Sequence, residues 1–308
     1  MIPFSHKPVL LNECLEGLKI DPKGTYLDCT VGGGGHSFEI ASRLNGGNLY
    51  CFDKDDEALA AADERLRQFD YVKLIKGDFR DADSLLKPYT CGIDGALLDL
   101  GVSSHQLDDP ERGFSYLNDG ALDMRMSSEG ETAADIVNTY DIEDLTKILR
   151  EYGEEPYAYQ IAKKIVNSRE TRDIMTTLQL SEIVTSALPP AIRRKEKHPA
   201  RRTFQALRIA VNDELGALTQ GLNAVFDLLN PGGRLCVITF HSLEDRIVKN
   251  FYKDKSQGCT CPPEFPVCVC GKVPLADIIT KKPVTADAEE LEINRRSRSA
   301  KLRVLQKR

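Results

Sequence analysis

The chain has 308 residues, of which 41% are hydrophobic and 29% charged, and its formal net charge is −6. This composition is typical of a globular protein and excludes a disordered chain or one coated in positive charge. No apolar run reaches membrane-spanning length and the start lacks a secretory signal, so we expect a cytoplasmic protein with no membrane partner.

A glycine turn follows the first predicted strand. The apolar, β-branched run Thr25–Val31 ends in four glycines, Gly32–Gly35, and a helical pattern then begins. Glycines permit positive φ and close ligand approach, and the start of the helix offers N–H donors. Twenty positions after Gly33, a second strand ends on Asp53, whose carboxylate can accept hydrogen bonds from both ribose hydroxyls. Together these features predict a nucleotide-type site.

The residues around the turn narrow the choice of ligand. A dinucleotide turn, G-x-G-x-x-G, would have glycine where Ser37 stands, and a P-loop would continue with Gly-Lys-Ser/Thr, which the chain lacks. An adenosyl ligand without phosphates, S-adenosylmethionine, fits better. NAD and a purely structural turn are the alternatives.

Two more strands complete the first α/β segment, which opens with an amphipathic helix over residues 6–21. The third strand ends at Asp78 and Phe79, an acid and an aromatic ring that suit an adenine, and the fourth ends on Asp99. Alternating strands and helices predict a doubly wound parallel sheet, in which ligands bind at the carboxyl ends of the strands. The glycine turn, Asp53, Phe79 and Asp99 all fall at such ends.

The α/β pattern breaks after Ser104. Residues 105–135 are polar and rich in turns, and helical segments lie at about 133–152, 155–168 and 178–187. We therefore expect an inserted, mainly helical domain over 105–204 within an α/β domain formed by 1–104 and 205–308. Such an insertion would cover the cleft and grip substrate.

The pattern returns after the insertion. Residues 204–233 predict one long helix with a Pro-Gly-Gly stop, and a fifth strand, a further helix and two short strands follow. We expect the last strand, near 299–306, to lie beside the fifth.

Two basic blocks stand out on this acidic chain. Residues 189–208 contain seven basic residues and one acid, and residues 294–308 contain seven basic residues and no acid. Clustered positive charge favours contact with a polyanion, with solvated surface charge as the alternative.

Two C-x-C pairs lie close together near the end of the chain. Four thiolates within twelve residues can bind a tetrahedral zinc ion, although the spacing is tighter than the usual C-x2–4-C. A proline-rich loop with reduced thiols is the alternative. The candidate zinc ligands are Cys259, Cys261, Cys268 and Cys270.

Several long motifs, taken together, resemble the bacterial 16S ribosomal RNA cytosine N4-methyltransferase family. They are TVGGGGHS, DLGVSSHQLDDPERGFSYLNDGALDMRM, YGEEPYAYQIAKKIV, HPARRTFQALRIAVNDEL, FHSLEDRIVK and RSRSAKLR. The resemblance implies a class I, Rossmann-like methyltransferase sheet. It also implies methyl transfer from S-adenosylmethionine to the exocyclic amine of one cytosine in the decoding centre of 16S rRNA, within the small ribosomal subunit. The oligomeric state stays open, a homodimer included.

The resemblance also assigns residues. His36 and Gln106 come mainly from it, whereas the other cofactor positions are also strand-end or turn residues. The predicted cofactor-binding residues are Gly33, Gly34, Gly35, His36, Asp53, Phe79, Asp99 and Gln106. The two basic blocks and the segment after the fifth strand, rather than the resemblance, supply the predicted RNA contacts, which are Arg201, Arg202, Arg246, Arg295 and Arg296.

The catalytic residues follow from the chemistry of the amine. The cytosine amine is a poor nucleophile because its lone pair is delocalised, so acceptors for its protons would direct the lone pair at the methyl group. The Asp99 carboxylate or a carbonyl of the turn 100–104 can play this part, with Ser103 and His241 as further candidates. A helix cap by Ser242 is the alternative role for the segment after the fifth strand. Methylation at carbon 5 would need a cysteine at the end of the fourth strand, and none stands there.

Overall fold

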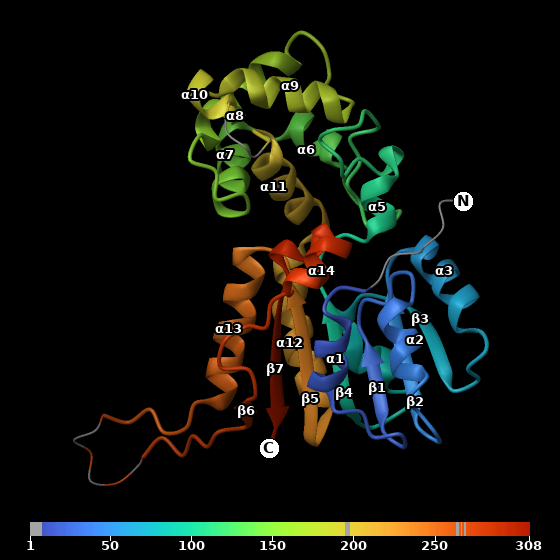
Figure 1. The fold of residues 1–308 in the computed structure, drawn as a ribbon. Helices are drawn as coiled ribbons and strands as arrows, with labels where there is room; N and C mark the ends of the chain where they lie inside the picture. Colours follow the sequence, from blue (N-terminus) through green and yellow to red (C-terminus); the bar gives the residue numbers. More distant parts are fainter. Residues whose placement is uncertain (1–7, 195–197, 263–264, 266, 268) are drawn as a thin grey trace. The chain divides into compact units, whose positions relative to one another are not determined.

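The computed structural model describes residues 8–194, 198–262, 265, 267 and 269–308 (Figure 1). The chain divides into two compact units, a sheet unit within residues 3–101 and 215–308 and a helical unit over 102–214. The predicted boundary after residue 204 falls inside helix α11 (Arg201–Asn212). Because Phe204 and Leu207 of α11 belong to the core of the helical unit, that unit extends to Glu214.

The sheet unit contains a seven-stranded sheet in the order β3-β2-β1-β4-β5-β7-β6. Neighbours among β1 to β5 run parallel, whereas β7 is antiparallel to both β5 and β6. The predicted doubly wound sheet is confirmed, and the last strand lies beside the fifth as expected. The strands are β1 (Thr25–Asp28), β2 (Asn48–Asp53), β3 (Val72–Lys76), β4 (Ile93–Asp99), β5 (Leu229–Thr239), β6 (Ala276–Ile278) and β7 (Lys301–Lys307).

Helices cover both faces of this sheet (Figure 1). Successive side chains of a strand point to opposite faces, so Leu49 and Cys51 join one core and Tyr50 and Phe52 the other. On the first face lie α1 (Leu11–Leu18), α2 (Gly35–Ala41) and α3 (Asp56–Leu66), and on the second lie α4 (Ala82–Leu86), α12 (Glu214–Leu228) and α13 (Ser242–Ser256). Short elements are η1 (Phe79–Asp81), α14 (Ala288–Ile293) and η3 (Arg295–Ser299).

The helical unit has its own apolar core. The predicted helix over 133–152 is two helices, because the Asp141 side chain accepts from the N–H of Asp144 and starts a new one. The elements are α5 (Ser104–Asp108), η2 (Pro110–Arg112), α6 (Ala133–Thr139), α7 (Ile142–Glu151), α8 (Ala158–Arg169), α9 (Thr177–Ala187), α10 (Pro190–Arg193) and α11.

The predicted long helix over 204–233 is also wrong. It breaks at Asp213, whose φ of 46° is left-handed and ends α11 before α12 begins. Its other end comes before the predicted Pro-Gly-Gly stop, since β5 begins at Leu229. In the described part of the chain, no helix combines the length and the apolar character needed to cross a membrane.

Candidate cofactor and active site

The carboxyl ends of β1, β2 and β4 bring three predicted features together. In the parallel register, Asp28 of β1 lies opposite Cys51 of β2 and Leu97 of β4. The N–H of Gly32 donates to Oδ2 of Asp53 at 2.9 Å, and Nδ1 of His36 lies 3.6 Å from Oδ2 of Asp99. The glycine turn, Asp53 and Asp99 therefore meet at one edge of the sheet, as the sequence predicts.

Backbone geometry explains the glycines of the turn. Gly34 has φ 73° and precedes α2, and no side chain caps this helix. A Cβ on Gly35 would lie 2.6 Å from Cγ of Pro8. The Arg65 side chain of α3 donates to the carbonyl of Gly33 at 3.1 Å and fixes the turn from one side. Glycine therefore supplies the left-handed backbone at position 34 and the close approach of Pro8 at position 35.

Asp53 is fixed by main-chain donors on both carboxylate oxygens. Oδ2 accepts from Gly32, and Oδ1 accepts from the N–H of Asp55 at 3.0 Å. Burial raises the pKa of Asp53, which these hydrogen bonds partly offset. Each oxygen has a second lone pair, so the carboxylate can still accept from the two hydroxyls of a ribose.

Ser37 stands where a dinucleotide-binding turn would have glycine, and its side chain has a structural role. Its hydroxyl is fully buried and donates to Oδ2 of Asp28 at 2.6 Å, while Oδ1 accepts from the N–H of Thr30 at 3.1 Å. Burial raises the pKa of Asp28 to about 6. Sequence reasoning missed Asp28, although an acid inside the apolar strand TYLDCTV is a signal of a buried, hydrogen-bonded carboxyl.

The His36 imidazole and the Asp99 carboxyl lie close together, and burial favours the neutral form of each. Nε2 of His36 donates to the carbonyl of Val9 at 2.9 Å, and burial lowers the pKa of His36 to about 4. Burial, with the charges of Asp28 and Glu244 nearby, raises the pKa of Asp99 to about 8. Oδ1 of Asp99 is buried, and no described residue forms a hydrogen bond with it. An orphaned buried acceptor of this kind is suited to a ligand donor.

Phe79 begins η1, with two residues between it and the end of β3. Its acid neighbour Asp78 lies 3.9 Å from Lys54, the residue that follows β2. The ring packs over Gly221 of α12, where a Cβ would lie 2.2 Å from Cδ2 of Phe79. Only glycine therefore leaves room for this ring position. Gly221 is a second residue that sequence reasoning missed, since the contact joins distant parts of the chain.

Ser103 and Gln106 belong to the helical unit, where they cap α5 together. Oγ of Ser103 accepts from the N–H of Gln106 at 3.2 Å, and Oε1 of Gln106 accepts from the N–H of Ser103 at 3.0 Å. The catalytic part predicted for Ser103 and the cofactor contact predicted for Gln106 stay proposals.

His241, rather than Ser242, caps α13. Its Nδ1 accepts from the N–H of Glu244 at 3.5 Å, and Oε2 of Glu244 accepts from the N–H groups of Phe240 and His241. Nε2 of His241 lies 3.1 Å from Oε1 of Glu244. Because β5 pairs with β4 with Ile238 opposite Asp99, this cap lies beside the carboxyl end of β4.

The basic blocks are partly neutralised within the fold. Arg303 and Lys301 pair with Asp245 at 2.7 and 3.3 Å, and Arg308 pairs with Asp277 at 2.6 Å. In the helical unit, Arg208 pairs with Glu214 at 2.8 Å. These pairs remove several residues from the candidate polyanion surface. Among the predicted RNA contacts, Arg201, Arg202, Arg246 and Arg296 are exposed, and the side chain of Arg295 lies outside the described structure.

Comparison with known proteins assigns the chain to a family. The model of the MraW methylase family matches residues 3–308. Three similar proteins each bear the name ribosomal RNA small subunit methyltransferase H. The protein of Finegoldia magna is 51% identical over 99% of both chains. That of Symbiobacterium thermophilum is 54% identical over 99% of this chain and 97% of its own, and that of Heliobacterium mobile is 54% identical over 99% of both.

Proposed function

Since the chain belongs to the MraW methylase family, we propose that it transfers a methyl group from S-adenosylmethionine to small-subunit ribosomal RNA. The observation that carries this proposal is identity above 50% along nearly the whole chain to proteins named for that reaction. We further propose the exocyclic N4 amine of one cytosine in the decoding centre of 16S rRNA as the acceptor, because of the motif resemblance.

The residues at the sheet edge suit S-adenosylmethionine. We propose that the Asp53 carboxylate accepts hydrogen bonds from the ribose hydroxyls and that the Phe79 ring contacts the adenine face. Gly33–Gly35 are proposed to contact the ligand through their main chain. His36, Asp99 and Gln106 complete the set. The orphaned Oδ1 of Asp99 and the lone pairs left on Asp53 support this assignment. When bound, the cofactor supplies a methyl group activated on a sulfonium sulfur.

Asp99 is the proposed acceptor for the amine proton. Methylation replaces one N–H bond of the amine with an N–CH3 bond, so one proton must leave. Asp99 can accept it only as a carboxylate, the form that the positive charge of a bound sulfonium would favour, and a carbonyl of the turn 100–104 is the alternative. Ser103 and His241 are proposed as positioning residues. The Ser103 side chain caps α5 at the end of the segment 100–104, and the His241 side chain caps α13 beside the carboxyl end of β4.

Methylation at carbon 5 is disfavoured. That reaction needs an accessible cysteine thiolate, and Cys29, Cys51 and Cys236 are buried. Burial raises the pKa of all three thiols, so they stay protonated at neutral pH. Nitrogen methylation needs no such group.

The helical unit is proposed to grip the RNA. Arg201 and Arg202 are exposed in the first turn of α11, and they are proposed to contact phosphates together with Arg246, Arg295 and Arg296. The substrate is proposed to be the assembled small ribosomal subunit, which would place the reaction in the cytoplasm.

The test is transfer of labelled methyl from S-adenosylmethionine to small subunits that lack the modification, followed by nucleoside analysis of the rRNA. We expect about one N4-methylcytidine per subunit, as one modified cytosine requires. An Asp53→Ala variant serves as the control with impaired cofactor binding. Label in 5-methylcytidine would contradict the assigned atom, and no label with normal cofactor binding would contradict the substrate.

A further inference from the structure

Residues 257–275 form an excursion from the sheet unit between α13 and β6 (Figure 1). Its base is closed by a hydrogen bond from the N–H of Leu275 to the carbonyl of Lys255 at 2.8 Å. The Lys272 ammonium adds an ion pair with Asp254 at 2.8 Å. Beyond these contacts the described residues of the segment extend away from the body of the sheet unit (Figure 1).

The excursion has no apolar core among its described residues. None of them is buried, and Val267 and Val269 expose 70% and 74% of their surface. A short segment that buries no apolar side chains needs another source of order, such as a bound metal.

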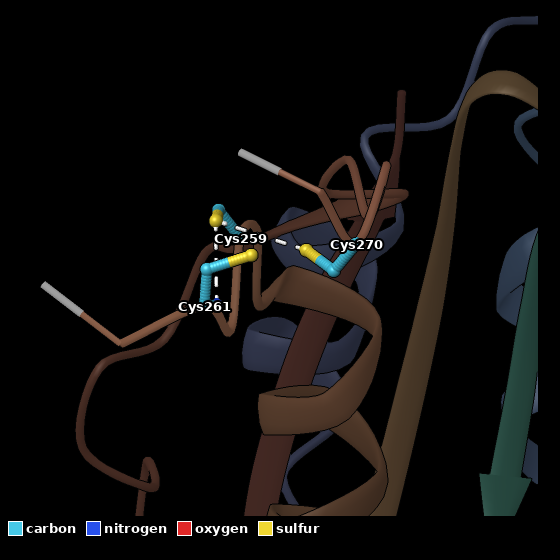
Figure 2. Close-up of side chains that lie close together, drawn as sticks. All are labelled: Cys259, Cys261 and Cys270. Atoms are coloured by element: carbon cyan, nitrogen blue, oxygen red, sulfur yellow. Dashed lines mark hydrogen bonds between the residues drawn. The ribbon is translucent and has the colours of Figure 1, made fainter. Parts of the chain in front are cut away.

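Three cysteines meet within this segment. The sulfur atoms of Cys259, Cys261 and Cys270 all lie within 4.8 Å of one another, and Figure 2 shows their side chains converging. The Sγ atoms of Cys259 and Cys270 are 3.7 Å apart. A tetrahedral zinc with Zn–S bonds of about 2.3 Å sets its sulfurs about 3.8 Å apart, whereas a disulfide needs about 2.05 Å. The observed separation matches the edge of a zinc tetrahedron.

Main-chain donors already point at two of these sulfurs. The N–H of Cys261 donates to Sγ of Cys259, and the N–H of Val269 donates to Sγ of Cys261, both at 3.4 Å. Hydrogen bonds to sulfur stabilise the thiolate form that binds metal and orient the ligand. The backbone therefore already places a hydrogen-bond donor at two of the three candidate ligand sulfurs.

We propose that Cys259, Cys261 and Cys270 bind one zinc ion that orders the excursion. Binding replaces the three thiol protons with Zn²⁺ and releases them to solvent, with no change of oxidation state. Soft thiolate ligands select zinc over magnesium or calcium. The spacing C-x-C is tighter than in common zinc modules, but the three sulfurs converge despite it. Cys268, the fourth ligand predicted from the sequence, lies outside the described residues.

Elemental analysis of the full chain, purified under reducing conditions without chelator, tests the proposal. We expect about one zinc per chain in the wild type and less than about a tenth in a Cys259→Ser/Cys270→Ser variant, as loss of two ligands predicts. Cys91→Ser is the matched control, because Cys91 is exposed elsewhere in the sheet unit, and it should keep the wild-type zinc content. Equal zinc in all three proteins, or less than about a tenth in the wild type, would overturn the site.

Three further measurements report on the site without relying on activity. Cobalt added to metal-free protein should give the visible absorption of tetrahedral cobalt thiolate, and the double serine variant should lack it. Chelation of the zinc should speed proteolysis within 257–275 while the rest of the chain stays intact. Intact-mass analysis that finds a disulfide among these cysteines in the protein as purified from cells would instead overturn the proposal.

Discussion

Nδ1 of His36 lies 3.6 Å from Oδ2 of Asp99, at the edge where the glycine turn meets the end of β4. Nε2 of His36 carries its proton, since it donates to the carbonyl of Val9, so Nδ1 is an acceptor. With the pKa of His36 lowered to about 4 by burial and that of Asp99 raised to about 8, both side chains are neutral at pH 7. The proposed cofactor would therefore meet an uncharged pair.

The positive charge of the cofactor should lower the pKa of Asp99. A sulfonium cation favours the carboxylate, so binding of S-adenosylmethionine should release a proton below the pKa of Asp99, about 8. We expect its dissociation constant to fall up to about tenfold per unit of pH between about pH 6 and 8 and then level off. Calorimetry across this range, in buffers of different ionisation enthalpy, measures both effects.

S-adenosylhomocysteine is the matched control ligand, because it has the same groups without the sulfonium charge. Its affinity should depend less on pH, and Asp99→Asn should flatten the response to both ligands. The same pH slope for the two ligands would remove Asp99 from the neighbourhood of the sulfonium.

The buried hydrogen bond between Ser37 and Asp28 should stabilise the sheet unit. Ser37→Ala removes the hydroxyl that donates to Asp28 at 2.6 Å, and we expect a loss of about 1–3 kcal/mol in the free energy of unfolding at pH 7. Urea unfolding measures it. Ser42→Ala is the control, since the exposed Ser42 hydroxyl bonds only its own helix, at the carbonyl of Phe38.

The stability lost in Ser37→Ala should depend on pH through the ionisation of Asp28. Because the folded pKa of Asp28 is raised to about 6, its contribution favours folding at low pH and is lost as pH rises from the unfolded value of 3.8 through about 6. The Ser37 hydroxyl lowers the pKa of Asp28. Without the hydroxyl this pKa should be higher, so the stabilising contribution of Asp28 should continue to fall above pH 6. A destabilisation that is equal at pH 5 and pH 8 would show that Asp28 is not the partner that matters.

Gly221 should control the position of Phe79. In Gly221→Ala the new Cβ would lie 2.2 Å from the Phe79 ring, so the ring must move. We expect a loss of about 1–3 kcal/mol in cofactor binding, the range for stacking of a base on an aromatic side chain. Alanine favours helices over glycine, so the change does not lower the intrinsic helix propensity of α12, and urea unfolding measures any cost of overpacking. Gln220→Ala, an exposed change in the same helix, should bind the cofactor normally, and normal binding by Gly221→Ala would remove Phe79 from the adenine site.

The exposed arginines of α11 should carry part of the RNA contact. Arg201→Ala/Arg202→Ala should weaken binding to the small subunit and reduce the slope of log affinity against log salt by about 0.7–0.9 for each phosphate that is no longer neutralised. Filter binding over a series of salt concentrations measures the slope. Arg308→Ala is the control, because Arg308 is exposed but paired with Asp277. An unchanged slope in the double variant would exclude α11 from the interface.

The sequence alone determined the strands of the parallel sheet and the residue types at their ends. Apolar runs of strand length, a glycine turn and acids that end the second and fourth strands are signals contained in a few neighbouring residues, and the structure has all of them. The apolar periodicity of residues 204–233 could not reveal the break at Asp213. One residue with left-handed backbone ends a helix without changing the apolar pattern on either side of it.

Only the tertiary structure decided which of these residues act on one another. The Ser37 hydroxyl on Asp28, the neutral pair of His36 and Asp99, and the Phe79 ring over Gly221 join segments that the chain order separates. The same holds for charge, since counting basic residues could not show that Arg303 pairs with Asp245. Burial and distance set both the pKa values and the exposed charge, and neither exists until the sheet and its helices have packed.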